Sequence, residues 1–176
     1  MKRYPYVKFS KNSGGDALNY ISYGWLMKTE PTECSIDDVW AMPNHTVGWF
    51  GVRNYQARNF MRDDFRIGQP ILFYHSSCSE PGIVGIAEVV SQPYPDPLQF
   101  DPKSKYYDPR SSLEKPRWQQ VDVKVLQKIK KIPLTQLRTI AGCETMKILQ
   151  KGNRLSITPV SEVEWKSLEP YFEPTL

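Results

Sequence analysis

The sequence contains little cysteine and little histidine. Its 176 residues include three cysteines and two histidines, widely separated along the chain. An odd number of separated cysteines argues against a disulfide framework and suits a reducing compartment. So few possible ligands at irregular spacing also argue against a structural zinc site. We therefore expect free thiols at Cys34, Cys78 and Cys143, and we expect neither a bound metal nor a cofactor.

Signals for membrane insertion are missing as well. No apolar run approaches the ~20 residues that a transmembrane helix needs. Residues 1–8 lack the apolar centre of a secretory signal. We expect a monomer without membrane contact, located in the cytoplasm of a bacterium or in the nucleus of a eukaryote.

Motifs of the common enzyme classes are also absent. The chain has no Gly-x-Ser-x-Gly, no phosphate-binding glycine loop and no metalloprotease signature. His75 and Cys78 are close enough in sequence for a nucleophile and its base, but no third orienting group is indicated. The sequence predicts a protein that is not an enzyme. The alternative is a small hydrolase or nucleotide-modifying enzyme that uses His75 with Cys78 or a carboxylate.

Charge is present but unevenly distributed. The net charge is +4, and residues 1–24 account for +3 of it. Between residues 115 and 154, ten lysines and arginines stand against two acids. A local basic block on a nearly neutral domain can attract a polyanion. The alternative is an ordinary solvated face of lysines.

The chain divides near residue 22. Residues 10–16 are polar and rich in Gly and Ser, which is typical of a flexible segment. We expect a flexible N-terminal extension over residues 1–22 and one domain over residues 23–176.

Short strands and helices are mixed along that domain. Strands are expected over 23–28, 71–76, 82–90, 118–126 and 155–159. Short helices are expected from Ser35, over 55–64, from Ile132, near Met146 and from Ser161. This pattern predicts an α+β fold, a small curved sheet or barrel, mainly antiparallel or mixed, with helices packed outside.

A long irregular stretch covers residues 92–117. It contains six prolines interleaved with aromatic residues. A loop of this length in a compact domain is usually functional or disordered, and rigid prolines with aromatics favour an ordered, functional one.

Aromatic and basic residues come together around Trp49. This tryptophan lies in a glycine-flanked loop, just before a helix that carries Arg53, Arg58 and Arg62. A flat ring for stacking and cations for phosphates are what base recognition needs. We expect phosphate contacts at Arg58, Arg62 and Arg117. The alternatives are a core tryptophan at position 49 and surface pairing of the arginines with neighbouring aspartates.

Several motifs in a fixed order resemble the EVE domain family. They are WLMKTEP at 25–31, WFGVRNYQARNF at 49–60, FYHS at 73–76 and PGIVG at 81–85. The resemblance continues through DPLQFDP at 96–102, YYDP at 106–109, PRWQQVDV at 116–123 and RLSITPV at 154–160. It covers about residues 23–168.

This resemblance implies a PUA-like barrel of five to six strands surrounded by short helices, related to YTH domains. It implies a module that reads a modified base of DNA or RNA, of the 5-methylcytosine or 5-hydroxymethylcytosine type, flipped into an aromatic pocket. The pocket residues carried over are Lys28, Thr29, Trp49, Phe50, Gly51, Val52, Arg53, Asn54, His75 and Ser76, with Phe100, Tyr106 or Tyr107 as the opposite wall.

The sequence departs from the family pattern at three positions, two of them among these pocket residues. Thr29 stands where the family usually has Ser and keeps the hydroxyl, and Ser77 replaces a common Asn. Phe50 stands where the family usually has Asp. An acid there would accept hydrogen bonds from a base amino group, which Phe cannot do.

Overall fold

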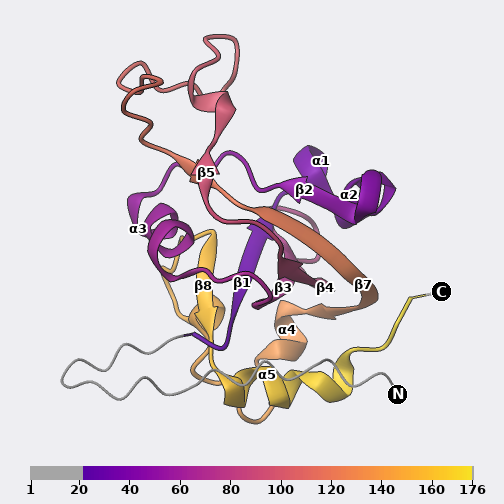
Figure 1. Cartoon of the computed structure of the whole chain (residues 1–176). Coiled ribbons are helices and arrows are strands. Elements are labelled where there is room, and N and C mark those ends of the chain that lie inside the picture. The colour runs from indigo at the N-terminus through magenta and orange to yellow at the C-terminus, as the bar shows by residue number, and fades with distance from the viewer. Residues whose placement is uncertain (1–21, 176) are drawn as a thin grey trace.

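A computed structural model describes residues 22–175 of the chain (Figure 1). The predicted N-terminal extension therefore lies outside the described residues, apart from Ser22. The Ser22 hydroxyl bonds to the backbone of Gly24 and of Val160, at the beginning of the first strand and the end of the last.

The central element is a six-stranded sheet that curls into a half-barrel (Figure 1). Its strands, in spatial order, are β2 (Thr46–Gly48), β7 (Asp122–Pro133), β4 (Gly82–Val89), β3 (Pro70–His75), β1 (Gly24–Thr29) and β8 (Ile157–Val160). All neighbours are antiparallel except β1 and β3, which are parallel. The predicted α+β class with a curved, mainly antiparallel sheet is confirmed.

The parallel pairing of β1 with β3 brings two sequence motifs together at one edge of the sheet. Trp25 pairs with Ile71 and Thr29 pairs with His75, so both strands end at the same edge of the sheet. Parallel strands point their carboxyl ends the same way, and ligands often bind at such an edge. The motifs at 25–31 and 73–76, which are 42 or more residues apart in sequence, therefore meet in space.

Alternation along the strands creates two cores, one on each face of the sheet. Trp25, Met27 and Phe73 point into one core, which is covered by α2 (Ile36–Ala41), α3 (Tyr55–Asn59) and the turn after it. Leu26, Leu72 and Tyr74 point into the other, which is covered by α4 (Leu134–Leu137) and α5 (Glu162–Leu168). Both faces of β1 and β3 are buried, which fixes the position of their ends.

Helix starts follow the capping residues in the sequence. Ser35 with Asp38 and Ser161 with Glu164 form capping boxes for α2 and α5, and the Asn54 side chain accepts hydrogen bonds from the first turn of α3. The predicted helix over 55–64 is present, but its hydrogen-bonding pattern changes partway. The α-helix α3 ends at Asn59, and a π-helical turn, η2 (Phe60–Asp64), follows it directly.

Two further differences lie in the second half. The predicted strand over 118–126 is split into β6 (Gln119–Gln120) and a longer β7, which pairs with β4 as far as Pro133. The helix expected from Ile132 begins only at Leu134, because Ile132 and Pro133 belong to this pairing. The remaining short elements are α1 (Pro31–Cys34), η1 (Pro43–His45), β5 (Tyr94–Pro95), η3 (Pro97–Gln99), η4 (Lys147–Leu149) and η5 (Glu169–Tyr171).

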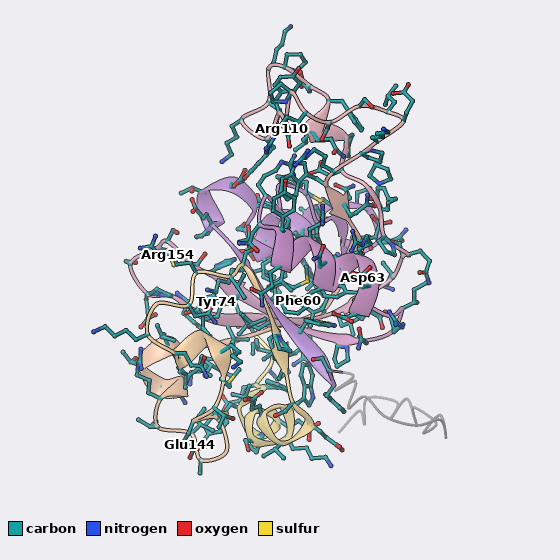
Figure 2. All side chains as sticks on the ribbon, turned by 90° about the vertical axis from the view of Figure 1, so that its left-hand side faces the viewer. Phe60, Asp63, Tyr74, Arg110, Glu144 and Arg154 are labelled. Carbon is teal, nitrogen blue, oxygen red and sulfur yellow. The ribbon has the colours of Figure 1, made fainter. Side chains whose placement is uncertain are left out.

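The long loop between β5 and β6 projects from the body at the end opposite α5 (Figure 1). Figure 2 shows the same arrangement from the side, with Arg110 at the tip region and Glu144 at the far end. No helix in residues 22–175 has the length and apolar character that crossing a bilayer requires.

Candidate functional site

A cleft of about 420 Å³ opens at the carboxyl ends of β1 and β3. Its walls come from the end of β1 with α1, the loop after β2, the loop after β3, the long loop and the segment before β8. The residues expected at a pocket that it brings together are Lys28, Thr29, Trp49, Phe50, Gly51, Val52, Arg53, Asn54, Ser76 and Tyr106.

Trp49 belongs both to the cleft and to the core. It lines the cleft, yet the residue is only 6% exposed, and its ring meets the edge of Phe73 at a centroid distance of 5.3 Å. The two interpretations of this tryptophan, pocket wall and core residue, therefore describe the same side chain. Removal of the Trp49 side chain would therefore affect both the folding of the domain and the binding of a ligand in the cleft.

Tyr106 lines the cleft and packs on the backbone of Gly51. Gly51 has φ of +80°, and a Cβ added there would lie 2.6 Å from the Tyr106 ring. A glycine is needed for both reasons. Phe50 meets the same ring edge-on, at 6.1 Å and 66°. Of the three aromatic candidates only Tyr106 lines the cleft; Phe100 lies outside it, and Tyr107 is 42% exposed.

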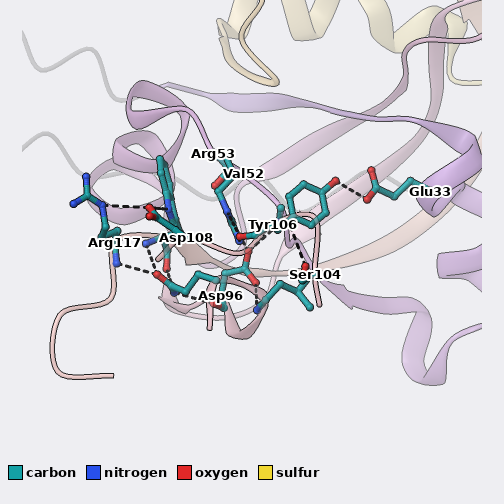
Figure 3. Close-up of polar contacts among 12 residues, drawn as sticks. Glu33, Val52, Arg53, Asp96, Ser104, Tyr106, Asp108 and Arg117 are labelled. Carbon is teal, nitrogen blue, oxygen red and sulfur yellow. Dashed lines mark hydrogen bonds and ion pairs between the residues drawn. The ribbon is translucent and has the colours of Figure 1, made fainter. Parts of the chain in front are cut away.

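Arg53 holds this wall in position (Figure 3). Its Nη1 lies 2.8 Å from Oδ2 of Asp96, a side chain that is completely buried. Its Nε and Nη2 donate to the Tyr106 carbonyl at 2.8 and 2.7 Å. The backbone N–H of Gly51 donates to the same Asp96 oxygen at 2.9 Å. Arg53 thus ties the loop after β2 to the long loop.

The long loop is ordered by buried polar groups, as the sequence predicted. The amide of Gln99 donates to the carbonyls of Asp96 and Trp118 and accepts from the backbone of Arg117 and Trp118. Asp108 accepts from the Trp118 indole at 2.8 Å. Burial raises the pKa of Asp108, but hydrogen bonds from Arg110 and Trp118 outweigh it and lower the pKa overall.

Lys28 and Thr29 form the floor at the end of β1. Burial lowers the pKa of Lys28, and no described acid forms an ion pair with it. The Thr29 hydroxyl donates to the Cys34 carbonyl at 2.9 Å, and Ser76 donates its backbone N–H to the Thr29 carbonyl. The Lys28 ammonium therefore has no described ion-pair partner in the cleft.

A family model fits this arrangement. The model of the EVE domain matches residues 23–170. This chain belongs to the EVE domain family. The resemblance stated from the sequence motifs is confirmed.

Named relatives and solved structures agree with the assignment. Thymocyte nuclear protein 1 of Danio rerio is 47% identical over 174 residues, which cover 89% of this chain and 75% of that protein. A crystal structure of a Pseudomonas putida protein is 42% identical, covers 84% of this chain and 97% of that one, and has a TM-score of 0.79. The crystal structure of human THYN1 protein in complex with 5-methylcytosine-containing DNA is 37% identical, covers 87% of this chain and 99% of that one, and has a TM-score of 0.79. The predicted PUA-like fold of this EVE domain is thereby confirmed.

His75 is placed differently from the other expected pocket residues of the EVE domain. It lies outside the cleft lining, and its Nε2 accepts a hydrogen bond from the backbone N–H of Ile36 at 3.0 Å. Burial lowers its pKa, and nearby Lys131 adds to the shift. Cys78 lies 4.0 Å from the carbonyl oxygen of His75. The ring nitrogen that would serve Cys78 as a base is already used to hold α2.

The three arginines expected at phosphates also lie outside the cleft of the EVE domain. Arg58 donates to the Arg117 carbonyl at 2.9 Å and lies over the Tyr55 ring. Arg117 pairs with Asp108 at 3.4 Å and bonds to the Tyr55 hydroxyl. Arg62 pairs with Asp63 at 2.7 Å on the surface. Figure 2 shows Asp63 and Arg154 on opposite sides of the molecule.

Sequence reasoning missed five lining residues that carry polar side chains: Glu30, Glu33, Ser77, Arg154 and Ser156. Arg154 ends the basic block and opens the last family motif, so a signal was present. Glu33 follows the first motif directly but belongs to the four-residue helix α1, whose position depends on the β1–β3 pairing. Proximity to the motif was its only signal.

The cysteines of the EVE domain form no disulfide. Cys34 and Cys143 are buried, and Cys78 is half-buried. Burial raises the pKa of Cys143 to about 11 and also raises that of Cys34, with nearby carboxylates adding to both shifts. Within residues 22–175, no three His, Cys, Asp or Glu side chains converge to hold a metal ion.

Proposed function

We propose that this EVE domain is a non-enzymatic DNA-binding module that reads 5-methylcytosine flipped into the cleft between Trp49 and Tyr106. The observation that carries the proposal is the cleft itself, whose lining includes the aromatic side chains of Trp49 and Tyr106 together with Lys28, with which no described acid pairs. The human THYN1 protein, which shares 37% of its residues with this chain, was crystallised with DNA containing 5-methylcytosine.

The chemistry of the cleft suits one extruded base. Proteins that select a single base rotate it out of the duplex and hold it by stacking and by hydrogen bonds to its edge. Tyr106 supplies a ring for stacking, and Lys28 supplies a donor for a ring nitrogen or carbonyl of the base. The backbone around Gly51 closes the wall tightly, which favours a flat ligand.

Phosphates flanking the base would meet positive charge at the rim. Arg154 is exposed there, and no described acid pairs with it. Arg58, Arg62 and Arg117 are proposed for phosphates farther along the strand, although Arg58 and Arg117 also hold the long loop. We further propose a monomer, and a nuclear location if the source is a eukaryote, in line with the name of the relatives.

The proposal is tested with three duplexes that differ only at one cytosine, which is unmodified, 5-methylated or 5-hydroxymethylated. Titration should give the tightest binding to the methylated duplex. Tyr106→Ala should lose about 5- to 150-fold in affinity for it, because base–aromatic stacking is worth about 1–3 kcal/mol. Tyr107→Ala is the matched control, since this neighbouring tyrosine lies outside the cleft, and it should bind as wild type.

Two results would overturn the proposal. Equal affinity for methylated and unmodified DNA would remove the reader function, and a tighter complex with methylated RNA would change the nucleic acid. A preference for the hydroxymethylated duplex would reassign the modification.

A salt titration tests the proposed rim contact. For duplex DNA, the slope of log affinity against log salt is about −0.9 for each phosphate neutralised. Arg154→Ala should make the slope shallower by about 0.9 and weaken methylated and unmodified duplexes equally, because phosphates carry no base information. Lys166→Ala, on α5, should leave the slope unchanged.

A further inference from the structure

One carboxylate in the cleft has an oxygen that no described residue uses. Glu33, on α1, lines the cleft with a side chain that is 24% exposed. Its Oε1 accepts a hydrogen bond from the Tyr106 hydroxyl at 2.5 Å (Figure 3). The same oxygen pairs with the Lys105 ammonium at 2.9 Å. No described residue donates a hydrogen bond to Oε2. Glu33 is thus held at one oxygen and open at the other.

The carboxylate is ionised at neutral pH. Burial raises the pKa of Glu33, but the hydrogen bonds from Tyr106 and Lys105 and the positive charge of Lys105 outweigh it, so the pKa is below its ordinary value. An ionised carboxylate only accepts hydrogen bonds, because it has no proton to donate. The two donors on Oε1 also restrict rotation of the group and keep it at the wall.

Most other charged side chains that line the cleft are hydrogen-bond donors and not acceptors. Lys28, Arg53 and Arg154 can only donate, and the other lining acid, Glu30, is exposed at the rim, where its Oε1 accepts from Ser77 at 3.0 Å. Phe50 offers no polar side-chain atom. Glu33 is therefore the partly buried acceptor in a cleft whose other partly buried charges are donors.

We propose that Glu33 selects bases that carry an exocyclic amino group, by accepting a hydrogen bond from that group at Oε2. The inference rests on the proposed function and deepens it, because it assigns the polar edge of the base to one residue. Acceptance of the cytosine amino group by Glu or Asp is an established mode of base readout. A keto oxygen at the same place would face a negatively charged acceptor and leave both groups unpaired.

Thymine provides the matched competitor. It has the same size of ring and the same 5-methyl group as 5-methylcytosine, and it differs in carrying a keto oxygen in place of the amino group and a proton on N3. Stacking on Tyr106 and contacts to the methyl group are therefore equal for the two bases. A difference in affinity between them reports on the hydrogen bonds at C4 and N3, and its change in a Glu33 variant reports on the amino group and its partner.

The experiment compares single-stranded oligonucleotides, or duplexes with an abasic site opposite the target, so that neither base loses a pair on extrusion. Target bases are 5-methylcytosine, cytosine and thymine. The wild-type protein should favour 5-methylcytosine over thymine by about 5- to 150-fold, the range of a good hydrogen-bonded base contact. In Glu33→Gln, Tyr106 can still donate to the amide oxygen, and the amide nitrogen then faces the base as a donor. The 5-methylcytosine-to-thymine ratio should fall to about one or below it.

Glu30→Gln is the matched control, because it removes the same charge at the rim of the same cleft and should keep the wild-type ratio. A wild-type protein that binds thymine as tightly as 5-methylcytosine overturns the inference without any variant. An unchanged ratio in Glu33→Gln also overturns it. The preference for 5-methylcytosine over cytosine tests the proposed function separately, since both bases carry the amino group. A wild-type protein without this preference would reject the reader function itself.

Discussion

Arg53 and Asp96 form an ion pair that joins two segments separated by 43 residues, with Nη1 of Arg53 2.8 Å from Oδ2 of Asp96. The Asp96 side chain is completely buried, whereas the Arg53 side chain is 21% exposed. Asp96 also accepts from the backbone of Gly51 and Leu98. The pair therefore holds the loop of Gly51 against the segment that carries Tyr106.

Arg53→Met should destabilise the domain by about 3–5 kcal/mol, because removal of one partner leaves a buried charge without its counterion. The same change releases the Tyr106 carbonyl, so DNA affinity should fall as well. Chemical denaturation and a DNA titration measure the two effects. Arg62→Met is the control: its ion pair with Asp63 is on the surface, and the free energy of unfolding should change by less than about 1 kcal/mol.

A double variant shows whether Arg53 and Asp96 stabilise the domain through their ion pair or independently of each other. If the ion pair is the cause, Arg53→Met combined with Asp96→Asn should cost less than the sum of the single changes. Strict additivity would show that Arg53 stabilises the fold through its other contacts.

Gly51 and Gly68 provide a second matched comparison. Both have positive φ, +80° and +86°, but a Cβ at Gly51 would meet the Tyr106 ring at 2.6 Å, whereas nothing lies within 4 Å at Gly68. Alanine at either position should cost about 1–2 kcal/mol for the left-handed backbone. Only Gly51→Ala must also displace Tyr106, so it should lose DNA affinity while Gly68→Ala binds as wild type. Equal binding by both variants would contradict the close packing of Tyr106 on Gly51.

Local signals in the sequence predicted much of this architecture. The capping residues Ser35, Asn54 and Ser161 mark helix starts, and the short continuous apolar runs in β1 and β3 mark strands that are buried on both faces. The loop from Trp49 to Asn54 was found because its motif lies in one continuous stretch. Such features depend on neighbours within a few residues, which a single sequence displays.

Features that depend on distant contacts were not predictable in the same way. The choice of Tyr106 over Phe100 and Tyr107 is made by its hydroxyl bond to Glu33 and its carbonyl bonds to Arg53. The place of Glu33 follows from the pairing of β1 with β3, and the length of β7 follows from its pairing with β4. No local pattern records these pairings.

His75 gives the domain a dependence on pH. Its Nε2 accepts from the backbone of Ile36, which requires the neutral ring, and burial lowers its pKa below the ordinary 6.5. Above pH 6.5 the ring is neutral in the folded and unfolded states, and stability is unaffected. As the pH falls through 6.5, the unfolded chain binds a proton that the folded protein refuses, so stability declines until the folded pKa is passed.

Melting temperatures measured between pH 7.5 and 5.5 should show this decline, in a window above the titration of ordinary carboxylates. His75→Gln should remove the decline, because its amide oxygen can accept from Ile36 at every pH. His45→Gln serves as the control for the other histidine and should retain it. A decline that persists unchanged in His75→Gln would assign the effect to other groups.

Trp49 decides how closely stability and recognition are linked in the cleft. If Trp49 only lined a pocket, a variant without its ring would fold normally. The structure instead buries this residue against Phe73, with 6% of it exposed. Trp49→Ala should therefore cost about 3–5 kcal/mol and lower the melting temperature by about 6 to 20 °C. Trp40→Ala is the comparison, because Trp40 is half-buried, stacks on His45 and lies outside the cleft. It should lose less stability and no DNA affinity.

Trp49→Phe isolates the recognition effect. Phenylalanine keeps an aromatic ring in the core, so most of the melting temperature should return, whereas the smaller ring presents less surface to a base in the cleft. Titrations with methylated and unmodified duplexes, at a temperature where each variant is folded, should show a reduced preference for the methylated base and unchanged binding of the unmodified duplex. If Trp49→Phe keeps the full preference while Trp49→Ala unfolds, the indole stabilises the wall from the core side and Tyr106 alone stacks on the base.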